Sequence, residues 1–451
     1  MGHLRGARIR AFAAGGGAGT GFTASAALAG LEGEGVRCHA LPTGARVLTQ
    51  AVPGARSFTI GFWVLVGSRD EAEGRHGSTH FLEHLLFKGT ENRSAEQIAA
   101  AFDGIGGEFN AATAKESTCY FARVLGDHSA LAIEVLADML TSSVLDRLDF
   151  ENERGVILEE LAMNQDDPSD VAHEAFAAAV YGDHPLARPI GGRPADIQAV
   201  SRDSVWDHYV NHYRPERLVV TASGQLDHDT VVSLVASALE KGGWGEAAAG
   251  RRQPAPLRPT EPQVALPAKG RVDGLARPTE QVQVLVGCEG LTATDERRHA
   301  LAVLGSVLGG GMSSRLFQEI REKRGLAYST YCFSSSHSDA GSFGVYAGCT
   351  PAASAEVTAL MESEWEQLAR EGLRPGELER VKGQLTGGTL LSLEEPYSLM
   401  NRLGRAATLM GELPPVEEVI ARIQAVTPDQ VRTLAADLAS RPRSRVVVGP
   451  N

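Results

Sequence analysis

The chain has 451 residues, of which 43% are hydrophobic and 22% are charged, and its formal net charge is −13. This length predicts at least two domains, and the composition is that of a soluble globular protein rather than a disordered, collagenous or membrane protein. The acidic charge argues against nucleic-acid and anionic-membrane partners, because both need a basic protein face. The five cysteines are scattered and form no CxxC pair, which argues against a disulfide framework and a thiolate metal site.

The first 35 residues differ in composition from the rest of the chain. Arg5, Arg8 and Arg10 precede a glycine–alanine run, an arrangement that resembles a signal peptide. Five glycines between Gly15 and Gly21 deprive this run of the apolar density of a signal sequence, and it is too poor in large apolar residues to span a bilayer. We therefore predict a disordered extension over residues 1–35 and a cytoplasmic protein.

In the first half of the chain, predicted strands come before predicted helices. Residues 57–67 form a β-branched and aromatic run typical of a strand, residues 94–97 form a capping box that opens a helix, and residues 109–125 indicate strand or a hairpin. Helical patterns follow, before a short strand at 218–222; they cover residues 129–141, 149–165, 171–180 and 205–213. This order favours an α+β domain with helices packed on one face of a mainly antiparallel sheet.

Weak internal repeats indicate that the chain is a duplication. Val64–Gly67 recurs as Val284–Gly287, and Ile197–Val200 recurs as Ile423–Val426, at offsets of 220 and 226 residues. Residues 251–278 contain six prolines, which excludes a regular helix or a central strand. We predict two structurally similar domains over residues 36–245 and 279–451, joined by a proline-rich, semi-rigid linker over residues 246–278.

The segment His80-Phe81-Leu82-Glu83-His84 has the clearest chemical meaning in the sequence. On a helix, residues i and i+4 share one face, so both imidazoles can reach one ion. Glu83 lies beside them, where a carboxylate can take a proton from metal-bound water. A catalytic zinc site usually has a third protein ligand. The helix at 149–165 offers two candidates on one face, Glu153 and Glu160, seven residues apart.

These residues resemble the insulinase and mitochondrial-processing-peptidase family of inverted-motif (HxxEH) zinc peptidases, in its short two-domain branch. The resemblance rests on residues 80–90 (HFLEHLLFKGT), on Glu153, and on residues 156–160 (VILEE), whose last residue follows His84 by 76 positions. It implies one Zn²⁺ per chain, held by His80, His84 and Glu160. It also implies that Glu83 is the general base and that Glu153 is a supporting carboxylate.

Two further segments extend the resemblance over nearly the whole chain from about Val36 onward. Residues 106–113 resemble the family's edge-strand segment, which implies that Asn110, Ala111 and Thr113 bind an extended peptide. Residues 309–316 (GGGMSSRL), followed by Arg321 and Tyr328, resemble its second-domain signature, which implies that Arg321 and Tyr328 act on the same substrate. The second half does not repeat the metal ligands, because an offset of 220 residues places the motif on apolar residues: Ala300, Val303 and Leu304.

The sequence thus predicts a zinc metalloendopeptidase that hydrolyses extended peptides or unfolded protein segments, as processing peptidases do. The resemblance implies a chamber between the domains, which would exclude folded proteins, and acidic walls consistent with the net charge would favour basic peptides. The family branch implies a homodimer or a heterodimer with a paralogous chain. A non-catalytic structural or partner subunit of the same fold is the alternative. The sequence contains neither a GxSxG elbow nor a GxxxxGK[ST] phosphate loop, which argues against a serine hydrolase and a nucleotide-binding protein.

Overall fold

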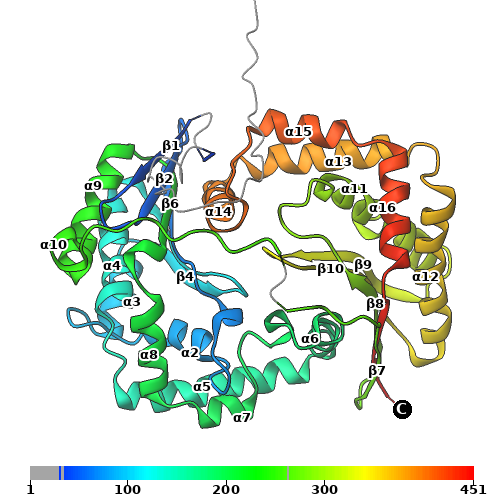
Figure 1. Cartoon of the computed structure of the whole chain (residues 1–451), viewed down its shortest axis with the longest axis horizontal. Helices are drawn as coiled ribbons and strands as arrows, with labels where there is room; N and C mark the ends of the chain where they lie inside the picture. The colour runs from blue at the N-terminus through cyan, green and yellow to red at the C-terminus, as the bar shows by residue number, and fades with distance from the viewer. Residues whose placement is uncertain (1–29, 32–34, 262–263, 451) are drawn as a thin grey trace, which may run out of the picture.

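The computed structural model describes residues 30–31, 35–261 and 264–450. The predicted disordered extension, residues 1–35, lies outside this part of the chain except for residues 30, 31 and 35, of which Leu31 is buried. Two α+β halves lie side by side (Figure 1). Among the helices of the described ranges, none has the length and apolar character needed to cross a membrane.

In the described residues, the first half contains six strands and nine α-helices. In chain order its elements are β1 (Val36–Ala40), β2 (Arg46–Ala51), β3 (Ser57–Val64), α2 (Ser78–Leu86), α3 (Ala95–Asp103), β4 (Glu108–Thr113), β5 (Thr118–Leu125), α4 (Ser129–Ser142), α5 (Arg147–Asp166), α6 (Pro168–Tyr181), α7 (Pro194–Ala199), α8 (Arg202–His212), β6 (Leu218–Gly224), α9 (His228–Leu239) and α10 (Glu246–Ala249).

The strands of the first half form one mainly antiparallel sheet in the order β1-β2-β6-β3-β5-β4. Only the β2–β6 pair is parallel. Helices α2, α4 and α9 cover one face, where Phe62 of β3 shares a fully buried core with Phe81 of α2 and Leu136 of α4. Strand β4 pairs with β5 alone among the described strands, so one side of its backbone is a free sheet edge.

The second half repeats this design with five strands. Its elements are β7 (Val272–Ala276), β8 (Val282–Glu289), α11 (Arg298–Gly309), β9 (Ala327–Ser336), β10 (Gly341–Cys349), α12 (Ser354–Glu371), α13 (Glu377–Ser392), α14 (Pro396–Arg405), α15 (Val416–Gln424), α16 (Pro428–Ser440) and β11 (Ser444–Gly449). The sheet order is β7-β11-β8-β10-β9, so β9 is its free edge as β4 is in the first sheet. Strand β7 lies within the predicted linker and forms the opposite edge, paired with β11.

Each half covers the remaining face of its sheet with a helix from the other half. Helix α6 packs on β8 and β11, and α14 packs on β2, β3 and β6; both helices lie between the sheets in Figure 1. Trp63 of β3 requires a glycine opposite it, because a Cβ on Gly404 of α14 would lie 2.3 Å from the indole ring. The predicted α+β class with two similar halves is confirmed, and the exchanged helices tie the two halves together.

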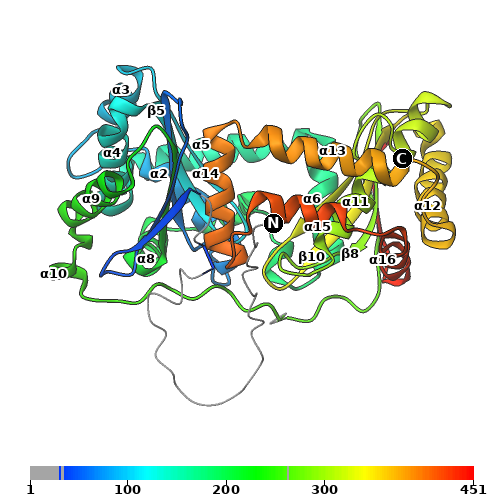
Figure 2. The same cartoon turned by 90° about the horizontal axis from the view of Figure 1, so that it is seen from above.

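Figure 2 shows the crossings from above, with α13 on one side of the molecule and the extended segment after α10 on the other. Helix α13 leads directly into α14, which packs on the first sheet. The halves are therefore connected by the exchanged helices as well as by the proline-rich segment, whose stiffness favours a defined relation between them.

Candidate active site

Helix α2 places the three polar residues of the HxxEH motif, His80, Glu83 and His84, on its partly exposed side. Its apolar residues pack inward, and Phe81 stacks on Phe150 of α5 with ring centroids 4.3 Å apart. Helix α5 begins at the N-cap Asp146, whose carboxylate accepts from the N–H of Leu148 at 2.7 Å. The stacked rings join α2 to α5, which is the helix that contains both predicted glutamates.

The start of α2 is fixed by a buried carboxylate. Gly77 precedes the helix with a φ of 85°, a left-handed conformation that favours glycine. The N–H groups of Gly77 and Thr79 donate to Glu71 at 2.8 and 2.7 Å, which satisfies amides that have no partner within the helix. Burial raises the pKa of Glu71 to about 7. This contact sets the position of Thr79, which directly precedes the first histidine of the motif.

His80, His84 and Glu160 converge, as the sequence predicted. The Nε2 atoms of His80 and His84 lie 3.7 and 3.4 Å from Oε2 of Glu160. One ligand atom from each residue lies within 4.8 Å of the others, and no second such group occurs in the described parts of the chain. Burial lowers the pKa of His80, and the nearby His84 lowers it further, which favours the neutral imidazole that binds metals. Two imidazoles and one carboxylate suit zinc.

Glu153 lies behind His84 and is itself buried, at 4% exposure. Its Oε2 lies 3.1 Å from Nδ1 of His84, and its Oε1 accepts from Nζ of Lys88 at 2.6 Å. Metal-binding histidines usually donate their second ring N–H to a carboxylate in this way. Lys88 was not singled out from the sequence, although its position four residues after His84 is a signal that could have found it.

Glu83 contacts the end of the edge strand β4. The hydroxyl of Thr113, the last residue of β4, donates to Oε2 of Glu83. The sequence predicts that Thr113 binds substrate, and in the structure its side chain is bonded to the predicted base, which leaves its backbone to that role. This hydrogen bond joins the motif helix to the strand where a peptide was expected to bind.

Asn110 and Ala111 lie on β4, at the free edge of the first sheet. The N–H of Ala111 donates to Oδ1 of Asn110 at 2.8 Å. A peptide that paired with this amide would therefore displace the Asn110 side chain. The position suits the predicted substrate-binding role, because a free edge can accept a further strand.

Arg321 and Tyr328 contact each other at the free edge of the second sheet. The Nη1 of Arg321 donates to the carbonyl of Tyr328 at 3.0 Å, and the guanidinium lies 4.4 Å from the centre of the Tyr328 ring. Tyr328 is 76% exposed. Within the described residues, neither side chain has a hydrogen bond or ion pair with His80, His84 or Glu160. The structure therefore brings the three predicted ligands together and shows no such bond from Arg321 or Tyr328 to them.

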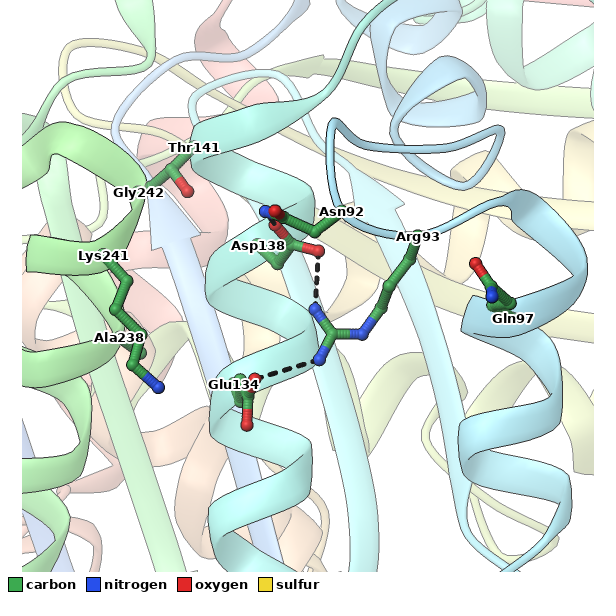
Figure 3. Close-up of a pocket in the computed structure, with 9 residues that line it drawn as sticks. All are labelled: Asn92, Arg93, Gln97, Glu134, Asp138, Thr141, Ala238, Lys241 and Gly242. Carbon is green, nitrogen blue, oxygen red and sulfur yellow. Dashed lines mark hydrogen bonds and ion pairs between the residues drawn. The ribbon is translucent and has the colours of Figure 1, made fainter.

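A surface pocket of about 490 Å³ lies elsewhere in the first half, between α4 and the segments that flank it (Figure 3). Arg93 donates to Asp138 at 2.8 Å and to Glu134 at 3.0 Å, and Asn92 donates to Asp138 at 2.7 Å. Four of the polar residues that line this pocket are thus bonded to one another. It contains no cluster that resembles the arrangement of His80, His84 and Glu160.

Two exchanged α+β halves, with an HxxEH helix in the first half alone, define the class of two-domain, inverted-motif metallopeptidases. The family model described as insulinase (peptidase family M16) matches residues 46–193, and the model described as the peptidase M16 inactive domain matches residues 199–385. The chain belongs to the insulinase family, peptidase family M16.

Relatives and solved structures agree with this assignment. The chain is 48% identical over 415 residues to an uncharacterized zinc protease of Streptomyces coelicolor, covering 92% of this chain and 90% of the relative. It is 35% identical over 428 residues to the uncharacterized zinc protease YmxG of Bacillus subtilis, covering 92% and 98%. The crystal structure of a protease from Helicobacter pylori has a TM-score of 0.83 at 22% identity, covering 92% and 99%, and shows the shared fold.

Proposed function

We propose that this chain is a zinc metalloendopeptidase that hydrolyses peptide bonds in extended peptides or unfolded protein segments. The main observation is the convergence of His80, His84 and Glu160, whose ligand atoms lie within 4.8 Å of one another. These three side chains would hold a zinc ion and would leave a position open for the attacking water. Two relatives are named as uncharacterized zinc proteases, which supports zinc as the metal and peptide-bond hydrolysis as the reaction.

The residues around the proposed metal site divide the chemistry between them. Zinc would supply a water with a pKa of about 7 and would polarise the scissile carbonyl. Glu83 takes the proton of the attacking water and passes it to the leaving amine, while the hydroxyl of Thr113 orients its carboxylate. Glu153 fixes the orientation of the His84 ring, and Lys88 holds Glu153 in place.

The substrate is proposed to bind as an additional strand on β4, near Asn110, Ala111 and Thr113. Backbone hydrogen bonds at a sheet edge provide affinity without demanding one sequence. Arg321 and Tyr328 approach from the second half and stabilise the negative charge that develops on the carbonyl oxygen. Because no hydrogen bond or ion pair joins this pair to the metal set among the described residues, we propose that closure of the two halves around a bound peptide completes the site.

A non-catalytic structural or partner subunit of the same fold is the second candidate. It is favoured by the match of residues 199–385 to a family model described as inactive. That match covers mainly the second half, whereas His80, His84 and Glu160 lie within the match to the insulinase model. The full ligand set therefore favours an active chain, which acts as a homodimer or with a paralogous partner.

Cleavage of a peptide library by the purified full chain, read by mass spectrometry, tests the proposal. We expect internal cleavage that stops on chelation and returns when zinc is added. Glu83→Gln is the matched negative control, because the amide cannot accept the proton. Zinc-dependent cleavage that is equal in the wild type and in Glu83→Gln would refute the assigned base. A chain that binds zinc but cleaves nothing, alone or mixed with a paralogue, would favour the non-catalytic subunit.

A further inference from the structure

A buried ionic network joins the hairpin between β4 and β5 to the hairpin between β9 and β10. We call it the interhalf network and define it by four residues: Arg69, Glu116, Ser338 and Asp339. Arg69 and Glu116 belong to the first half, whereas Ser338 and Asp339 form the turn of the second-half hairpin. The bonds between the two halves thus join residues 222 and 270 positions apart in the sequence.

Arg69 is the centre of this network. Its Nη1 and Nη2 donate to the two carboxylate oxygens of Asp339 at 2.7 and 2.8 Å, a two-pronged geometry that fixes both groups. The same Nη1 donates to Oε1 of Glu116 at 2.7 Å. The side chains of Arg69 and Asp339 are only 9% and 3% exposed, so solvent screens this pair weakly.

Glu116 lies at the tip of the β4–β5 hairpin and binds the second half directly. The hydroxyl of Ser338 donates to its Oε1 at 2.6 Å, and the N–H of Ser338 donates to its Oε2 at 3.1 Å. Burial alone would raise the pKa of Glu116, but hydrogen bonds from His337 and Ser338 and the charge of Arg69 outweigh it and lower the pKa to about 2. Glu116 is therefore ionised at neutral pH.

The segment that links the halves is bound at the same place. Arg258 donates through Nη1 to Oδ1 of Asp70 at 2.6 Å and through Nη2 to the carbonyl of Glu116 at 3.2 Å. Asp70 adjoins Arg69 in the chain, so one cluster of charges fixes both hairpins and the linking segment. The cluster therefore contacts three segments: the β4–β5 hairpin, the β9–β10 hairpin and the segment that links the halves. A contact that stabilised one half alone would not involve all three segments.

The network lies at matching ends of the two free sheet edges. Strand β4 ends at Thr113, three residues before Glu116, and β9 ends at Ser336, three residues before Asp339. Thr113 holds the proposed base Glu83, and Tyr328 lies near the start of β9. Because strands within a sheet are stiff, joining the two tips restricts how the edges can lie relative to each other.

We propose that Arg69, Glu116 and Asp339 are positioning residues, which set the separation of β4 and β9 and so keep the metal site of the first half within reach of Arg321 and Tyr328. This inference rests on the proposed peptidase function for its kinetic consequence. Its structural consequence, the separation of the two halves, does not depend on that function.

The experiment compares Asp339→Asn with a matched control in the full chain. Asp339→Asn removes the charge that Arg69 pairs with while keeping the side-chain volume. Glu377→Gln is the control, because Glu377 binds Arg315 at 2.9 and 2.7 Å in an equally buried two-pronged pair that lies wholly within the second half. Glu116→Gln is a second test variant in case Asp339→Asn folds poorly.

Four quantities are measured for each variant: zinc content, kcat and KM on one peptide, and the radius of gyration from small-angle X-ray scattering on size-separated protein. We expect both network variants to keep zinc, to have a larger radius of gyration, and to lose roughly ten- to hundred-fold in kcat/KM, the scale of a misplacement of about 1 Å. Arg69→Lys, which keeps the charge but not the two-pronged geometry, should lie between wild type and Asp339→Asn.

The outcomes separate this proposal from the proposed function. Unchanged kcat/KM and radius of gyration in both network variants would overturn it, and so would equal losses in Glu377→Gln, which would indicate general destabilisation. If the wild type neither binds zinc nor cleaves peptides, the peptidase proposal fails, and the scattering comparison alone still decides whether the network sets the separation of the halves.

Discussion

Lys88 Nζ lies 2.6 Å from Oε1 of Glu153, and this pair stands directly behind the His84 ring. Glu153 is buried, so removing its cation leaves a carboxylate with one less partner in a poorly solvated place. We expect Lys88→Met to weaken zinc affinity by roughly ten- to hundred-fold, the usual effect of losing an outer partner of a metal-binding histidine.

Zinc titration of the metal-free protein checks this prediction. Arg422→Ala is a suitable control, because it removes a cation from an ion pair with Glu418 in the second half. Lys88→Arg should restore most of the affinity. Equal zinc affinities for wild type and Lys88→Met would mean that Lys88 merely covers the site.

The metal set predicts a simple stoichiometry. Among the described residues, one group of side chains could hold a metal ion, and it consists of His80, His84 and Glu160. We therefore expect about one zinc per chain. The double variant with His80→Ala and His84→Ala should contain none. Elemental analysis of both proteins after dialysis checks this, and undiminished zinc in the double variant would contradict the assignment.

Glu83 and Glu160 should respond differently to the same amide substitution. Glu83→Gln keeps the ligand set intact and removes only the proton acceptor, so we expect normal zinc content and a loss of turnover. Glu160→Gln removes a charged ligand, so zinc content and turnover should fall together. Parallel metal analysis and peptide assays distinguish the two, and near-wild-type turnover in both variants would show that the assigned roles are wrong.

The raised pKa of Glu71 predicts that the stability of the folded chain depends on pH. Its pKa is about 7 in the folded chain against an ordinary value of 4.5, so folding favours the protonated carboxyl. Its contribution to stability is therefore complete below about pH 4.5 and is lost as the pH rises from about 4.5 to 7. A shift of this size corresponds to at most about 3 kcal/mol.

Denaturant unfolding of wild type and Glu71→Gln between about pH 4 and pH 8, a window that spans the shift, measures the difference in free energy of unfolding. We expect this difference to change with pH in the direction that lowers wild-type stability toward pH 8. A difference that stays constant across the window would contradict the raised pKa.

Local geometry predicted the pair of histidines, and the resemblance to the peptidase family selected Glu160 over Glu153 as the third ligand. The spacing of His80 and His84 places them on one helix face, and Glu160 belongs to a long helix with a clear pattern. The partners of Glu83 and Glu153 depend on tertiary packing, which is why the sequence indicated neither Lys88 beside Glu153 nor the bond from the Thr113 side chain to Glu83. The exchange of α6 and α14 was also beyond prediction, because neither helix differs in pattern from one that covers its own sheet.

The repeats show how sequence similarity can mislead. Ile197–Val200 and Ile423–Val426 fall at corresponding ends of α7 and α15, each directly before the N-cap of the next helix. Val64–Gly67 begins at the last residue of β3, whereas Val284–Gly287 lies inside β8. The first match reflects the duplicated fold, and the second is a coincidence of two apolar strand segments.

The contact between Arg321 and Tyr328 leads to a final prediction about the second half. Tyr328→Phe removes only a hydroxyl, whereas Arg321→Ala removes the cation that lies 4.4 Å from the ring and the donor to the Tyr328 carbonyl. Both variants should keep full zinc and normal size, because neither residue is among the three proposed ligands and neither is bonded to them among the described residues. If the pair stabilises charge in the transition state, each should lose roughly ten- to thousand-fold in kcat/KM. Wild-type kinetics in both variants would mean that the second half is a scaffold, and that closure brings no catalytic group to the substrate.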